Sequence, residues 1–106
     1  MRKEGTAKGS IEQRAANWWV ESLKGKEIDG TKMSSLCEKL SAAIGSNIEK
    51  HGFVIISTVP GDNGRVLRKA AERCGIPIGD FPYNTKMEIR DGLITVTLET
   101  GRKITI

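Results

Sequence analysis

Residues 86–106 of this 106-residue chain read KMEIRDGLITVTLETGRKITI, and their alternation of apolar and polar side chains decides the fold class. The Asp91-Gly92 pair is a strong signal for a two-residue hairpin turn. Closing that turn places Ile89 opposite Ile94 and brings the flanking apolar residues onto one face. The stretch therefore predicts an antiparallel hairpin with one buried face.

A second turn follows around Gly101. A three-residue loop over 100–102 would set Leu98 opposite Ile104 and keep both on the apolar face, whereas a two-residue loop would turn Ile104 to the wrong side. We therefore expect a β-meander that ends in an edge strand at 103–106. Pairing of that edge with a second copy would give a homodimer.

Upstream, residues 53–59 (FVIISTV) form a short β-branched run between glycine and proline. Because apolar side chains occupy both faces of the run, the pattern predicts a strand near the middle of the sheet.

Three segments have apolar residues at helical spacing. The first starts at Ser10 in an S-x-x-Q capping box and stops near Gly25. The second is capped by Asp29 or Thr31 and ends at Gly52, and the third begins after Asp62 or Asn63 and ends at Gly75. The first two helices are expected to form a hairpin.

The predicted order is ααβαβββ, an α+β fold with helices packed on a mixed or antiparallel sheet of about four strands. We expect one domain over residues 10–106, preceded by a flexible basic tail at 1–9. The sequence has no apolar run long enough to span a membrane and no visible signal peptide, which favours a cytoplasmic protein.

The sequence offers little catalytic chemistry. His51 is the only histidine and falls in the last turn of the second helix, where a cation is favourable. Cys37 and Cys74 lie on apolar helix faces and are interpreted as buried free thiols, with a disulfide between them as the alternative. The loop at 60–64 (PGDNG) lacks the phosphate-loop pattern. We predict no enzyme activity, no catalytic residue, no metal and no cofactor.

Two groups of residues are candidates for binding a macromolecule. The third predicted helix carries four cations on the side away from its apolar residues, which suits phosphates or an acidic protein surface. They are Arg65, Arg68, Lys69 and Arg73. On the first helix, Trp18 cannot share the centre of one face with Trp19, so it is expected to be partly exposed beside Arg14 as a protein interface.

Small size, a net charge of +4 and the absence of catalytic residues favour a stoichiometric binding protein. The hypothesis is a regulator or inhibitor of a nucleic-acid-handling machine, such as an anti-CRISPR-like protein from a phage or mobile element. Its partner would be a protein or nucleoprotein. The alternative is a direct nucleic-acid-binding protein that uses the basic helix face, although aromatic residues make up only 5% of the chain.

Overall fold

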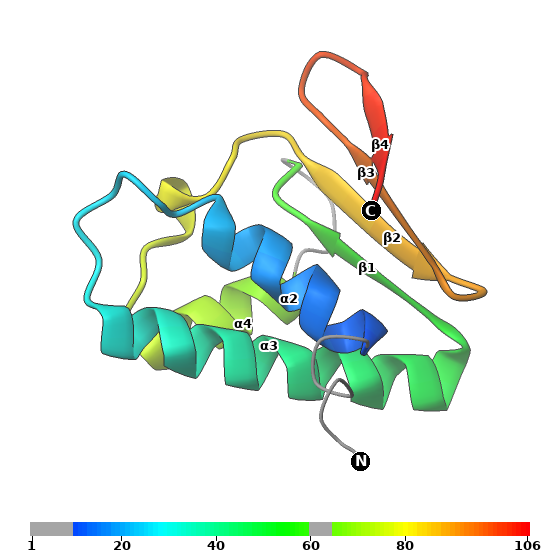
Figure 1. The fold of residues 1–106 in the computed structure, drawn as a ribbon, viewed down its shortest axis with the longest axis horizontal. Coiled ribbons are helices and arrows are strands. Elements are labelled where there is room, and N and C mark those ends of the chain that lie inside the picture. The colour runs from blue at the N-terminus through cyan, green and yellow to red at the C-terminus, as the bar shows by residue number, and fades with distance from the viewer. Residues whose placement is uncertain (1–9, 60–64) are drawn as a thin grey trace.

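The computed structural model describes residues 10–59 and 65–106 and has the predicted α+β architecture. The helices lie along one face of a four-stranded antiparallel sheet (Figure 1). The helices are α2 (Ile11–Glu21), α3 (Gly30–His51) and α4 (Arg65–Cys74), with a short 3₁₀ turn η1 (Ile78–Asp80). The strands, in spatial order, are β1 (Phe53–Ser57), β2 (Lys86–Arg90), β3 (Leu93–Thr97) and β4 (Lys103–Thr105).

Local signals fix the helix ends. The Ser10 side chain accepts a hydrogen bond from the Gln13 backbone N–H at 3.0 Å, and Asp29 caps α3 by accepting from Thr31 at 2.9 Å. Gly52 closes α3 in the left-handed region at φ 83°, which glycine adopts at no steric cost. The tail at 1–9, the loop at 60–64 and the caps predicted at Asp62 or Asn63 lie outside the described residues.

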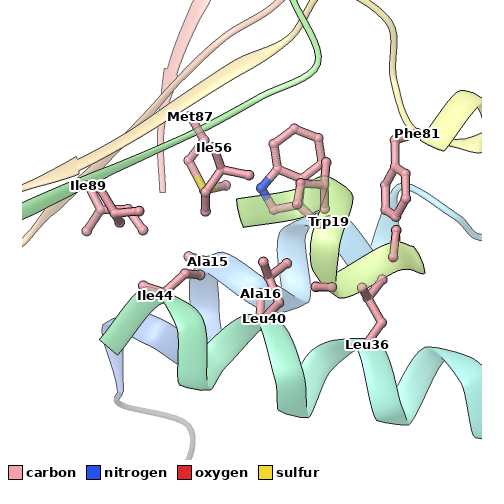
Figure 2. Close-up of a cluster of buried hydrophobic side chains, with 14 of the residues drawn as sticks. Ala15, Ala16, Trp19, Leu36, Leu40, Ile44, Ile56, Phe81, Met87 and Ile89 are labelled. Carbon is pink, nitrogen blue, oxygen red and sulfur yellow. The ribbon is translucent and has the colours of Figure 1, made fainter. Parts of the chain in front are cut away.

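The core lies between the helices and the inner face of the sheet (Figure 2). Trp19 of α2 sits at its centre, with Ile56 and Met87 of the sheet on one side and Phe81 of the 76–84 loop on another. All four side chains are buried. Burial of this apolar area is the main source of stability for a domain of this size.

The β2–β3 hairpin has the predicted register, with Ile89 opposite Ile94. Asp91 and Gly92 both have positive φ, 54° and 77°, as a two-residue turn of this twist requires. The apolar residues of both strands therefore face the helices.

The register predicted for the last strand is wrong by two residues. Ile104 lies opposite Val96 rather than Leu98, because the connecting loop runs from Leu98 to Arg102. The loop is closed by a hydrogen bond from the Leu98 N–H to the Arg102 carbonyl, at 2.8 Å. A shift of two residues preserves the side-chain faces, so Ile104 still points toward the core.

The prediction that residues 53–59 form a central strand is also wrong. The sheet order β1-β2-β3-β4 makes β1 an edge strand. Val54 and Ile56 pack on the helices, whereas Phe53 and Ile55 lie on the outer face and are half-buried. On this outer face the Arg90 side chain of β2 covers part of the Phe53 ring, with its guanidinium 4.4 Å from the ring centroid. Apolar residues on both faces of this run therefore do not mark a central strand.

Candidate functional site

A surface groove separates α3 from α4, with a volume of about 310 Å³. Its apolar lining is formed by Ala43 of α3 together with Val66 and Ala70 of α4. All three are small or branched residues, so the two helices leave a hollow between them without exposing a large side chain. The groove is therefore a consequence of how α3 and α4 pack.

Cations line both sides of this hollow. Arg65, Lys69 and Arg73 lie at i, i+4 and i+8 on α4, and Lys39 faces them from α3. All four are exposed. Since residues four apart share a helix face, the three α4 cations form one continuous basic wall.

No carboxylate is among the described residues that line the groove. The ion pairs between described side chains, Lys24–Glu21 and Arg90–Glu88, lie on other elements. None of the four groove cations is therefore ion-paired with a described carboxylate. A partly enclosed site lined by charges of one sign concentrates their potential.

The four cations predicted as one basic cluster on α4 do not all lie in the groove. Arg68 is exposed but does not line the groove, whereas the other three cations do. Lys39 and Asn47 were missed by the sequence analysis. With Ala43 they form an i, i+4, i+8 stripe on α3, which is the signal that could have found them.

The Arg14–Trp18 pair lies apart from the groove, because no residue of α2 lines it. Arg14 is exposed and Trp18 is half-buried against the core. The Trp18 ring meets the Trp19 ring edge-on, with centroids 5.0 Å apart. Its role as a protein interface stays a prediction.

The remaining chemically active residues do not converge. His51 is exposed at the end of α3. Cys37 and Cys74 are half-buried free thiols, and the Cys37 thiol lies 3.2 Å from the Asn17 side-chain oxygen. Within residues 10–59 and 65–106, no group of three potential ligands is placed to hold a metal ion. Nor does any helix in those ranges have the length and apolarity needed to cross a membrane.

Fold and groove together define a small α+β domain with a cationic groove on its helical side. Among solved structures, it resembles the BTG/Tob domain of FOG-3 from C. elegans, with a TM-score of 0.70 and 19% identity. The match covers 89% of this chain and 85% of that chain. No protein-family model and no curated protein matches the sequence. The similarity therefore establishes a BTG/Tob-like fold.

This fold overturns the functional hypothesis drawn from the sequence. The anti-CRISPR-like inhibitor of a nucleic-acid-handling machine was inferred from small size and charge, whereas the fold is that of a BTG/Tob domain from a nematode protein. That prediction is wrong. The alternative of direct nucleic-acid binding is set aside with it, because three of the four cations line a groove together with apolar residues.

Proposed function

We propose that this BTG/Tob-like domain is a non-enzymatic protein-binding module whose α3–α4 groove binds an acidic segment of its partner. The observation that carries the proposal is the lining of the groove, in which apolar residues are flanked by Lys39, Arg65, Lys69 and Arg73. No carboxylate is among the lining residues in the described part of the chain. Such a surface favours a segment with carboxylates around an apolar side chain.

The size of the groove supports a peptide as the ligand. Its volume of about 310 Å³ is at the lower end of the range of roughly 300–1,000 Å³ for small-molecule sites. That space suits one or two side chains of a longer segment. The lining also has no aromatic residue on which a nucleic-acid base could stack.

The same lining supports binding without catalysis. Its described residues are lysine, arginine, asparagine, alanine and valine, with no histidine, cysteine, carboxylate or hydroxyl side chain among them. Those groups supply most nucleophiles and proton-transfer residues in enzymes. The free thiols of Cys37 and Cys74 support a reducing compartment such as the cytoplasm as the place of action.

Reversing one groove charge should abolish most of this binding. Peptides selected on the wild-type protein from a random displayed library should be rich in aspartate and glutamate around an apolar residue. Lys69→Glu should weaken their binding about tenfold, because it places a carboxylate in the groove against the partner's own. Fluorescence polarisation at two salt concentrations measures the effect, and the wild-type affinity should fall as salt rises.

Arg68→Glu is the matched control. It makes the same change of charge sign one residue away on α4, at an exposed position outside the groove. It should keep nearly all of the wild-type affinity. Equal losses in the two variants would mean that only net charge matters, and peptides without acidic residues would contradict the proposal. A higher affinity for labelled RNA or DNA than for every peptide would also contradict it.

A further inference from the structure

The main chain of β1 presents hydrogen-bonding groups at a sheet edge. The Thr58 N–H donates to the Thr85 carbonyl of the neighbouring segment at 2.8 Å, so the backbone of Thr58 points toward β2. In an antiparallel pair this direction alternates from residue to residue. The backbone N–H and carbonyl of Ile55 therefore point away from β2, toward the side where no described strand lies.

A second cavity, of about 460 Å³, lies along this edge. Val54 from the inner face of β1 and Ile55 from the outer face both line it. Asn47 and Val66 of the helical layer also line it, so the cavity extends from the helices to outer-face Ile55 past the edge of β1. The space is therefore next to the backbone groups of Ile55.

The edge cavity adjoins the α3–α4 groove. Asn47, Arg65 and Val66 line both hollows. The Asn47 amide nitrogen donates to the Ala43 carbonyl at 2.8 Å, which holds the side chain against α3 at the junction. One extended segment can thus lie along the β1 edge and continue between the two helices.

Charge identifies the kind of segment that fits. Arg65 and Lys86 line the edge cavity, and its other lining residues within 10–59 and 65–106 include no carboxylate. Glu88, which lies opposite Ile55 on β2, is held by Arg90 at 3.0 Å and is outside the lining. The edge cavity therefore has the same charge preference as the groove.

We propose that the partner's acidic segment binds in extended form and adds to the sheet as a strand beside β1. This inference rests on the proposed function and adds the conformation of the ligand and the backbone contacts that hold it. Main-chain hydrogen bonds to Ile55 supply affinity, and the cations of the two cavities select for acidic side chains.

The opposite edge of the sheet is a weaker acceptor. β4 has three residues, and exposed Lys103 is one of them. A short edge strand that carries a lysine is a common protection against pairing. The homodimer predicted through β4 is untested, and the two cavities that favour strand addition lie at β1.

Selective N-methylation of a peptide tests the proposal without altering the protein. The probe is a short capped peptide in which valine and glutamate alternate. N-methyl groups on all its valines block the amides along one edge of the extended chain, and N-methyl groups on all its glutamates block the other. Strand addition predicts that one methylated form loses at least about tenfold in affinity while the other binds as the parent does. Equal binding of both forms would overturn the proposal.

Hydrogen exchange provides the readout on the protein. In the full-length wild-type protein saturated with the parent peptide, the Ile55 amide should exchange about tenfold more slowly than in the free protein. An unchanged exchange rate at saturation would overturn strand addition, whatever the methylated peptides do.

Ile55→Pro removes the outward-facing N–H, which the β1–β2 ladder does not use. Ile55→Pro should lower the affinity for the parent peptide about tenfold. The control Ile55→Thr keeps the N–H and the β-branching, so it should leave that affinity unchanged. If Ile55→Pro fails to fold, the methylated peptides and the exchange rate of the Ile55 amide still test strand addition.

The same peptide separates this proposal from the proposed function. Binding that is lost in Lys69→Glu but indifferent to Ile55→Pro and to both methylation patterns would keep the groove and remove strand addition. Binding that depends on the Ile55 N–H but not on Lys69 would keep strand addition and remove the groove. A parent peptide that does not bind the wild-type protein at millimolar concentration would contradict both.

Discussion

Replacing Trp19 with alanine is expected to lower the free energy of unfolding by about 3–5 kcal/mol. The side chain is fully buried at the centre of the core, between α3 and the sheet (Figure 2). Its ring meets Phe81 edge-on with centroids 6.1 Å apart. Alanine would leave a cavity bounded by the helices, the sheet and the 76–84 loop, which cannot all close on it.

The neighbouring tryptophan provides the control. Trp18 is half-buried, so Trp18→Ala should cost about 1 kcal/mol, mainly the edge-on ring contact with Trp19. Urea denaturation followed by circular dichroism measures both values. Equal losses in the two variants would mean that Trp18 is as much a core residue as Trp19. Such a result would contradict the partly exposed position on which its interface role depends.

Features set by neighbouring residues were predictable from the sequence. The cap at Ser10, the left-handed glycine at Gly52 and the register across Asp91-Gly92 each depend on a few consecutive residues, and the structure has all three. The element order follows from the same local patterns. The α+β class and the order of the elements could therefore be derived from the chain alone.

The strand order and the last register depend on pairing between segments that are distant in the sequence, and they were not predictable. The apolar run 53–59 has the composition of a central strand, but strand order depends on which segments pair across the chain. Likewise, two loop lengths that differ by two residues give the same side-chain faces, so the apolar pattern could not fix the last register. The periodicity of apolar residues determines which face of the sheet each side chain occupies. It does not determine which strands pair with one another.

The candidate site shows the same division. The basic face of α4 was visible as a spacing of cations, but the sequence could not separate Arg68 from Lys69. Only the packing of α4 on α3 decides which cations face Lys39 across a hollow. The spacing of the cations thus predicted a basic surface. The tertiary structure adds a groove that shares Asn47 and Arg65 with the cavity at the edge of β1.

The second large stability effect is expected at Thr58, where one hydroxyl joins two distant segments. Thr58 Oγ1 donates to the Pro82 carbonyl at 2.6 Å and accepts from the Thr85 N–H at 3.0 Å. These bonds fasten the 76–84 loop, which carries Phe81 into the core, to the segment after β1. Thr58→Val keeps the shape of the side chain and removes both bonds.

Thr58→Val should therefore lower the free energy of unfolding by about 2 kcal/mol, because a backbone donor at buried Thr85 and a carbonyl at half-buried Pro82 lose their partner together. Thr58→Ser keeps the hydroxyl and should recover most of that stability. Thermal and urea unfolding of the two variants measure the difference, which isolates the hydroxyl from the methyl group. A serine variant as unstable as the valine variant would show that packing of the methyl group, and not the hydroxyl, secures the loop. The loop would then owe its position to its apolar contacts, among them that of Phe81 with Trp19.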